Sequence, residues 1–185
     1  CDPCAWAKII DNTPIFIATY VDDLLIISTP NLCRSTLADL RSRYICRGDS
    51  EIETFLGMQF TSGASKFFIS MENYIFKYAK QQGYDSDNHI RRWSTPGQKH
   101  PGTPRPNKRD EPQVHFCTLT KLSPSDQKTF QSYVGAFQWI SNCGRPDITY
   151  ATQVLASRAH EPLERDLVAA KRLLGYLVRT AASKL

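Results

Sequence analysis

The fold of the first part of the chain is decided by the segment Ile15-Phe16-Ile17-Ala18-Thr19-Tyr20-Val21-Asp22-Asp23-Leu24-Leu25-Ile26-Ile27. Two apolar runs of the kind that forms β-strands flank four residues, Tyr20 to Asp23. This pattern predicts a buried hairpin, covered on at least one face, whose tip carries the adjacent carboxylates of Asp22 and Asp23. Hairpin tips usually contain glycine or asparagine because a tight turn needs positive φ. Turn geometry therefore does not explain these two aspartates.

Adjacent carboxylates on a stiff β scaffold are suited to a two-metal site for phosphoryl transfer. Their oxygens are hard ligands for Mg²⁺, and rigid strands can set the spacing between the metals. Tyr20, just before the turn, offers a flat surface for a sugar or a base. The alternative is a solvated acidic turn, which Asp-Asp alone would favour. The apolar flanks favour the metal site instead.

A series of motifs then follows in order along nearly the whole chain. Tyr-Val-Asp-Asp with Leu-Leu-Ile-Ile-Ser (20–28) resembles the catalytic hairpin of reverse transcriptases, in particular those of copia-type LTR retrotransposons. The resemblance continues through DPC (2–4), FLGM (55–58), STP (94–96), YVG (133–135), RPDITYA (145–151) and AAKRLLGYL (169–177). The chain departs from the family at Arg47-Gly48-Asp49-Ser50, where the family has Asp-Leu-Gly, and at Gln131, where an Arg is usual.

The resemblance implies an α+β fold with palm-like antiparallel hairpins and packed helices, followed by a helical thumb and an all-helical connection segment. Residues 1–69 would form a partial palm with the YVDD hairpin and a second hairpin like the primer grip. Residues 70–95 would form a thumb-like helical segment, 96–122 a Pro-rich basic linker, and 123–185 the helical connection segment.

Local patterns predict the elements of the first two segments. Thr29 can cap a helix and Pro30 suits its first turn, and Cys33, Leu37, Leu40 and Tyr44 then recur at helical spacing. Alternation over 56–61, the turn sequence 62–65 and the apolar run 66–69 predict the second hairpin. A helix then opens at Ser70, with an apolar face made of Met71, Ile75, Tyr78 and Gln82.

Three more helices are predicted after the linker. Ser123-Pro124 begins the first, which Gly144 ends, Pro146-Asp147 begins the second, and Pro162 begins the third. Their apolar members are Phe130, Tyr133, Val134 and Phe137, then Tyr150, Val154 and Leu155, then Leu167, Ala170, Leu174 and Leu177. Trp139, like Phe137, is expected in the core and not at a base-stacking site.

The resemblance also assigns roles to individual residues. Asp22 and Asp23 would be the catalytic and metal-binding residues of an RNA-directed DNA polymerase, with two Mg²⁺ ions in the complete enzyme and Mn²⁺ as an alternative. Contacts to an RNA or DNA template-primer would come from Tyr20, Val21, Phe55, Leu56, Gly57, Met58, Lys77 and Lys80. Gly57 would let the nucleic-acid backbone come close, whereas the residues alone favour a plain bulge glycine.

In the family, a third catalytic Asp, the fingers and the nucleotide-binding segment precede this hairpin. We therefore expect an excerpt from a Pol polyprotein that cannot polymerise alone, with the dNTP bound by the full-length enzyme. One alternative is a non-catalytic, nucleic-acid-binding remnant of a decayed or domesticated element. Another is an unrelated metal-dependent hydrolase, although all four histidines lie far along the chain from Asp22.

Composition sets wider bounds. The chain has 185 residues, of which 41% are hydrophobic and 22% charged, as in ordinary globular proteins. A net charge of +5 permits a polyanionic partner. No apolar run is long enough to span a membrane and no signal-peptide pattern is present, so we expect no membrane partner. The expected location is cytoplasmic, in a virus-like particle, with nuclear entry also open.

The scattered cysteines are expected to be buried free thiols, and Asp85, Asp87 and His89 are expected to belong to a polar loop.

The first prediction concerns the Pro-rich basic segment. Limited proteolysis should cut first between Gly97 and Glu111. A stretch without periodic apolar residues can neither pack an apolar face against the core nor pair as a strand in a sheet. Mass spectrometry of the first fragments locates the cut. A first cut inside 15–28 or 163–178 would contradict the predicted organisation.

Overall fold

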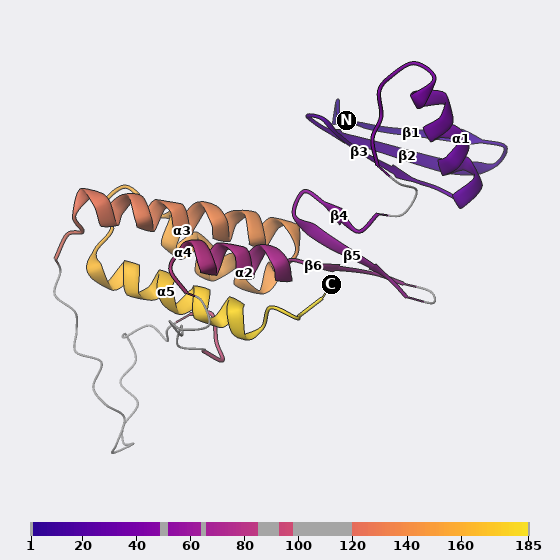
Figure 1. Cartoon of the computed structure of the whole chain (residues 1–185). Helices are drawn as coiled ribbons and strands as arrows, with labels where there is room; N and C mark the ends of the chain where they lie inside the picture. The colour runs from indigo at the N-terminus through magenta and orange to yellow at the C-terminus, as the bar shows by residue number, and fades with distance from the viewer. Residues whose placement is uncertain (1, 49–51, 64–65, 85–92, 98–119, 185) are drawn as a thin grey trace. The chain divides into compact units, whose positions relative to one another are not determined.

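The computed structural model describes residues 2–48, 52–63, 66–84, 93–97 and 120–184 (Figure 1). The chain divides into two compact units, Cys1–Leu56 and Gly57–Leu185. The described residues form two three-stranded sheets and five α-helices, so the expected α+β class is confirmed.

The first sheet has the order β1-β2-β3, made of β1 (Ala5–Ile10), β2 (Thr13–Tyr20) and β3 (Asp23–Ile27). Both strand pairs are antiparallel, and Tyr20 pairs with Asp23. The predicted acidic hairpin is therefore present, with Val21 and Asp22 as its tip. A further hairpin, which was not predicted, joins β1 to β2 through Asp11 and Asn12, whose φ angles are 45° and 60°.

The acidic hairpin is less buried than predicted. Within the described sheet, only Ile15 is fully buried. The helix α1 (Pro30–Arg41) lies along one side, where the Cys33 sulfur approaches the Ile26 carbonyl oxygen at 4.0 Å. Phe16 and Ile27, paired across β2 and β3, remain 50% and 55% exposed. The prediction of a buried hairpin is thus wrong, because apolar composition does not reveal whether a second layer covers the sheet.

The second sheet and the helix after it agree with the predicted patterns. β4 (Thr54–Phe55), β5 (Met58–Ser62) and β6 (Phe67–Ser70) lie in the order β4-β5-β6, and β5 and β6 form the predicted hairpin. The helix α2 (Glu72–Gln81) follows, and Met71, Ile75 and Tyr78 are buried as predicted.

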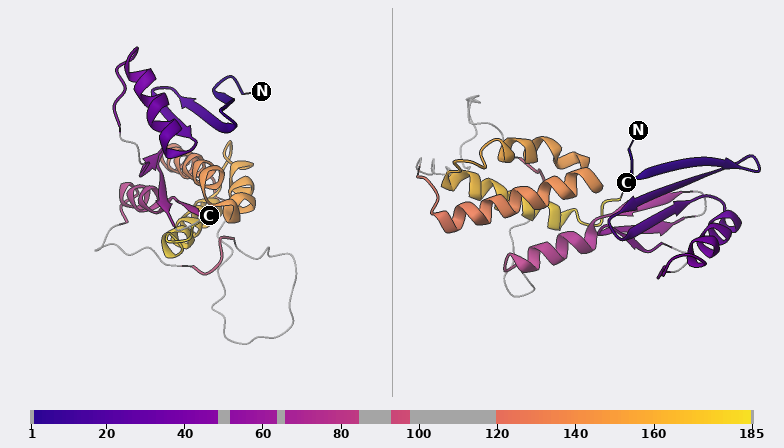
Figure 2. Two further views of the ribbon diagram at one scale, coloured as in Figure 1. Left: turned by 90° about the vertical axis from the view of Figure 1, so that its right-hand side faces the viewer. Right: turned by 90° about the horizontal axis from the view of Figure 1, so that it is seen from above.

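The remaining helices form one core with α2. They are α3 (Pro124–Cys143), the 3₁₀ turn η1 (Pro146–Ile148), α4 (Thr149–Ala156) and α5 (Glu164–Arg179), and α3 lies beside α4 and α5 (Figures 1 and 2). The predicted apolar face of α3 is buried throughout, and Ser123 caps the helix by accepting a hydrogen bond from the Asp126 backbone N–H at 3.1 Å. The prediction for Tyr150, which is 75% exposed, is wrong, whereas Trp139 is half-buried and packs against the core, in partial agreement with its predicted core position.

A buried arginine ties the turn after α3 to the end of α5. Arg145, 3% exposed, donates two hydrogen bonds to the Asp147 carboxylate, at 2.9 and 2.8 Å, and one to the Thr180 carbonyl oxygen at 2.9 Å. The Tyr176 hydroxyl donates to Asp147 at 2.7 Å. These bonds satisfy a charge that would otherwise be costly to bury, so this part of the RPDITYA motif has a structural role.

The prediction about the cysteines has a clear outcome. The thiols of Cys4, Cys33, Cys46 and Cys143 are free, but Cys4 is exposed and the others half-buried, so the prediction that they are buried is wrong. Among the described residues, no helix combines the length and apolar character that crossing a bilayer requires. Cys1, Cys117, the 85–89 loop and most of the basic linker lie outside the described residues.

We predict that Asp147→Asn lowers the free energy of unfolding at pH 7 and that this loss shrinks in acid. Hydrogen bonding from Arg145 holds the pKa of the Asp147 carboxyl below its usual value. A carboxyl with a lowered folded-state pKa stabilises the fold above its unfolded pKa of about 3.9, and this contribution is lost as the pH falls through the folded value. Urea unfolding from pH 7 to pH 3 measures the difference.

The control for this prediction is Glu161→Gln. Its ion pair with Lys121 is exposed on both sides, with side chains 68% and 75% accessible, so the substitution should change stability little at any pH. If Asp147→Asn lowers the free energy of unfolding as much at the lowest pH as at pH 7, the charge of Asp147 does not stabilise the fold through its hydrogen bonds with Arg145.

Candidate functional site

The tip of the acidic hairpin has an unusual backbone. Val21 has a φ of 53°, in the left-handed region that β-branched residues rarely adopt. Holding such a residue there costs about 1–3 kcal/mol, and strain of this kind clusters at functional sites. Val21 is 88% exposed, so packing within the described residues does not explain the conformation.

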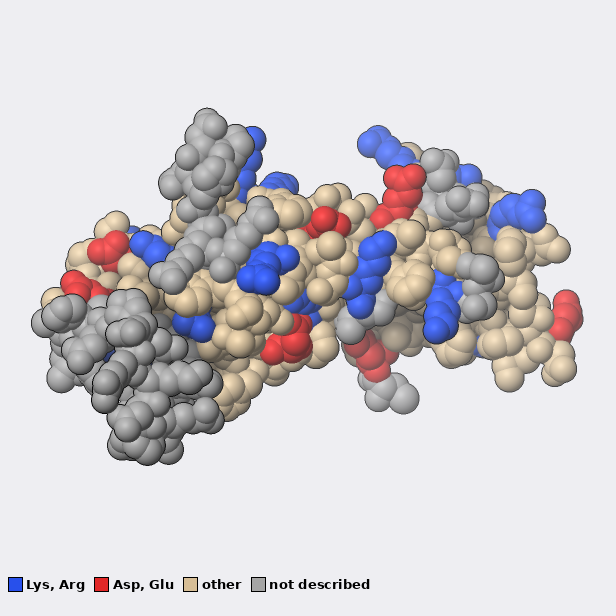
Figure 3. Space-filling view, turned by 90° about the horizontal axis from the view of Figure 1, so that it is seen from below, with Lys and Arg blue, Asp and Glu red and all other residues tan. Residues whose placement is uncertain are grey.

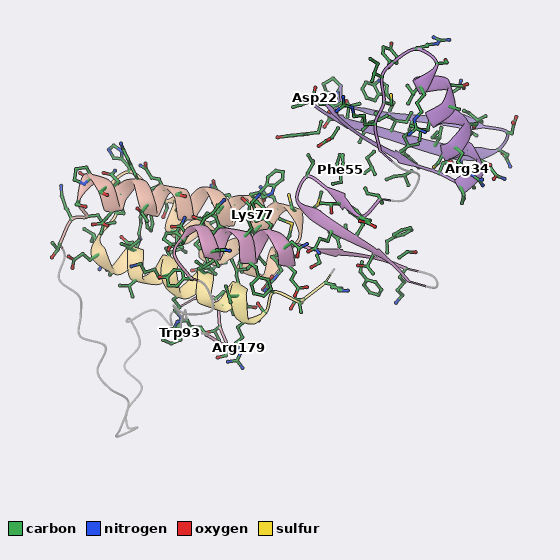
Figure 4. The ribbon with its side chains drawn as sticks, viewed as in Figure 1. Asp22, Arg34, Phe55, Lys77, Trp93 and Arg179 are labelled. Atoms are coloured by element: carbon green, nitrogen blue, oxygen red, sulfur yellow. The ribbon has the colours of Figure 1, made fainter. Side chains whose placement is uncertain are left out.

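The two carboxylates follow directly. Asp22 is the second residue of the turn, and Asp23 is the first residue of β3, opposite Tyr20. Both are exposed, and neither side chain forms a hydrogen bond or an ion pair with any residue that the structure describes. Figure 4 shows Asp22 at the end of the first sheet. The pair is therefore free to accept a cation.

A cleft of about 660 Å³ in the first unit contains both carboxylates. Five consecutive residues, 22–26, line it together with Phe55, residues 45–48 and part of α1. Four residues of β3, 23–26, line it, and β3 is the outer strand in the order of the described sheet. The predicted site residues Asp22, Asp23 and Phe55 therefore all line this one cleft.

The cleft also includes residues that sequence reasoning did not assign to the site. Arg34 of α1 and Arg47 both line it. The Arg34 guanidinium donates to the Asn31 side chain at 2.8 Å and to the Pro30 carbonyl oxygen at 3.2 Å, which fixes it near the start of the helix. Asp22 and Arg34 lie toward opposite ends of this unit (Figure 4). Helical and strand periodicity carry no signal for such long-range contacts.

The donor set fits part of a magnesium site. Mg²⁺ is commonly held by one or two carboxylates together with water and substrate phosphates. A two-metal site also needs further ligands to clamp ions about 3.5–4 Å apart. No group of three or more His, Cys, Asp and Glu side chains in the described ranges could hold a metal ion. Asp22 and Asp23 can thus supply ligands without completing the site.

The predicted primer-gripping segment divides between the two units. Phe55 lines the cleft of the first unit, whereas Met58 packs against the core of the second. Between them, Leu56 and Gly57 have φ angles of 51° and 79°, so the chain bends sharply there. A Cβ on Gly57 would lie 3.3 Å from Tyr74 Cδ2 and 4.0 Å from Trp139 Nε1. Both the left-handed backbone and the close approach require glycine.

Lys77 and Lys80 are exposed on α2, whereas Ile75, Tyr78 and Ala79 are buried. Figure 4 shows Lys77 on the surface of this helix. Lys and Arg side chains are spread over the face in Figure 3, with Asp and Glu among them. The lysines are therefore available to an anionic partner in the second unit, while the carboxylates belong to the first.

Fold and site together define an α+β protein with an acidic, strained hairpin tip and a helical unit bearing exposed lysines. The chain is distantly homologous to Pol polyproteins of transposons. It is 30% identical over 169 residues to a Saccharomyces cerevisiae protein described as a transposon Ty5-1 protein. It is 29% identical over 167 residues to the retrovirus-related Pol polyprotein from transposon RE1 of Arabidopsis thaliana.

A third relative is the retrovirus-related Pol polyprotein from transposon TNT 1-94 of Nicotiana tabacum, 24% identical over 180 residues. The three alignments cover 90%, 90% and 95% of the chain. They cover 50%, 10% and 13% of the relatives, so the chain spans half or less of these proteins. It matches no protein-family model, and no solved structure matches it significantly.

We predict that Val21→Gly stabilises the acidic hairpin by about 1 kcal/mol, because glycine adopts the left-handed region without the Cβ clash. Native-state hydrogen exchange of the β2 and β3 amides measures the local opening free energy. Asn12→Gly is the matched control in the neighbouring hairpin, and it should gain less because asparagine tolerates this region. Unchanged or faster exchange in Val21→Gly would refute the assigned strain.

Proposed function

We propose that the chain is the part of a copia-type reverse transcriptase that carries the catalytic palm hairpin, the primer grip, the thumb and the connection. The observation that carries this proposal is the pair Asp22-Asp23 at the tip of an antiparallel hairpin, behind a strained Val21 and inside a cleft. The homology to transposon Pol polyproteins supports the same class.

Asp22 and Asp23 act as metal ligands in the complete enzyme. Bound Mg²⁺, or Mn²⁺ in its place, supplies activation of the primer 3′-hydroxyl and neutralisation of the dNTP phosphates. The contribution of the protein is to hold both carboxylates at a fixed strand register, with Tyr20 beside Asp23. Such preorganisation avoids rearrangement during the reaction.

The remaining site residues bind the RNA or DNA template-primer. Tyr20 and Val21 are exposed at the tip and lie near the primer end, and the segment from Phe55 to Met58 holds the primer strand. Lys77 and Lys80 contact phosphates, which gives affinity without sequence preference. The rest of the Pol polyprotein is the further partner.

Two carboxylates do not complete a two-metal site, and the described residues supply no third ligand nearby. A further carboxylate must come from another part of the polyprotein. The chain by itself therefore binds template-primer weakly and incorporates no nucleotide.

A second candidate is a non-catalytic, nucleic-acid-binding remnant of a decayed or domesticated element. One observation favours it: Arg47 and Gly48, which depart from the family pattern, line the same cleft as the carboxylates. In that case template-primer binding persists, but no reconstruction restores catalysis.

We predict that Asp22→Asn abolishes Mg²⁺-dependent primer extension in a reconstructed full-length polymerase while leaving template-primer affinity unchanged. The substitution removes one charge from the metal ligands and no phosphate contact. Extension of a primed RNA and a binding titration measure the two effects.

The control is Asp39→Asn, which removes an exposed carboxylate of α1 that does not line the cleft. It should retain normal extension. Normal extension by Asp22→Asn would rule out the assigned role, and a reconstructed enzyme inactive with both aspartates intact would favour the remnant.

A further inference from the structure

Trp139 differs from its neighbours on α3. Phe137 and Ile140 are completely buried, but Trp139 is half-buried at the edge of the core. Its Nε1 is 4.0 Å from the place where a Cβ on Gly57 would lie, so the indole N–H is beside the bend at the start of β5. No residue in the described ranges accepts a hydrogen bond from it. The indole nitrogen is not among the buried polar atoms that lack a partner in the described residues, so it reaches the surface and is available as a donor.

Two aromatic side chains closely approach the bend at Gly57. Leu56 and Gly57 both have left-handed backbones, and Gly57 has no side chain to cover the peptide groups. Tyr74 Cδ2 of α2 and Trp139 Nε1 of α3 both lie within 4.0 Å of the place that a Cβ on Gly57 would occupy. Partial burial raises the pKa of the Tyr74 phenol, so the ring remains neutral beside any anion.

An exposed lysine follows Tyr74 on the same helix. Lys77 is one helical turn beyond Tyr74 on α2, and residues three apart are neighbours on a helix surface. Lys77 is exposed. An indole N–H without a described partner and an exposed lysine are groups that contact the sugar-phosphate backbone of nucleic acids.

We propose that Trp139 is a nucleic-acid contact, and that its indole N–H donates to a phosphate or sugar oxygen of the strand lying over Gly57. This inference rests on the proposed function, which places the primer strand along residues 55–58. It adds a residue from α3, a helix that the sequence assigned to the connection segment. It also gives Gly57 a second role, because a side chain there would separate the indole from the strand.

Trp139→Phe tests the inference in the purified 185-residue chain, because it removes the donor and keeps an aromatic ring. Binding of a primer-template duplex is measured by fluorescence anisotropy over a range of salt concentrations. We expect affinity to fall several-fold with an unchanged salt dependence, because no charge is lost. Lys77→Gln should instead lower the slope of log affinity against log salt by about 0.9.

The matched control is Tyr150→Phe, which removes a hydroxyl donor from an exposed aromatic residue of α4. It should leave affinity unchanged. A second measurement does not depend on the folding of Trp139→Phe. With Trp6 and Trp93 replaced by Phe, Trp139 is the sole tryptophan, and bound duplex should quench its emission.

Equal affinity of Trp139→Phe and the wild type, or unchanged emission of the sole Trp139 on saturation with duplex, overturns this inference alone. In either case the proposed contacts of residues 55–58 with the primer strand are unaffected. If the wild-type chain binds no duplex at low salt, the proposed function and the inference both fail.

Discussion

The helical unit depends on the buried face of α3. Tyr133 packs edge-on against Tyr78 of α2, with ring centroids 6.0 Å apart, and stacks on Phe137 at 5.8 Å. Large apolar side chains that are fully removed from water each contribute about 1.5–3 kcal/mol, so these rings stabilise the packing of α2 against α3. The same contact fixes Tyr74 and Trp139 on adjacent helices, and thereby the surroundings of Gly57.

The first unit is organised differently. Ile15 is the only fully buried residue in the described strands of this unit. The hydrogen bonds between the strands therefore define the geometry of the sheet more than side-chain packing does. The pairing of Tyr20 with Asp23 is what brings the carboxylates to the tip, since a slip of one residue would move every side chain to the opposite face. The strand register therefore sets the position of the two carboxylates at the hairpin tip. The same register places Val21 in a strained, left-handed backbone conformation.

Sequence patterns predicted the elements whose signals are local. The apolar runs around residues 20–23 gave the hairpin, Ser123-Pro124 gave the start of α3, and the period of its buried residues gave its core face. The β1–β2 hairpin was missed although Asp11-Asn12, between two strand-like runs, is a recognised turn signal. Tyr150 was misplaced because it precedes Leu155 by five residues, which puts the two about 140° apart around α4, whereas the buried Thr152 and Leu155 are three residues apart and share a face. Arg34 and Arg47 in the cleft, and the unpaired Trp139 beside Gly57, follow from tertiary contacts that no local pattern encodes.

The proposed function depends on Asp22 and Asp23 as ligands of the catalytic metal of a polymerase. Iron-mediated cleavage tests it most directly: Fe²⁺ replaces Mg²⁺ in a reconstructed full-length enzyme with bound template-primer, and peroxide then cuts the backbone next to the metal. Cuts are expected within a few residues of 22 and 23, and they should be suppressed by excess Mg²⁺ and absent when both aspartates are replaced by asparagine. Cleavage that is unchanged in that double variant, or that occurs only elsewhere in the chain, would contradict it.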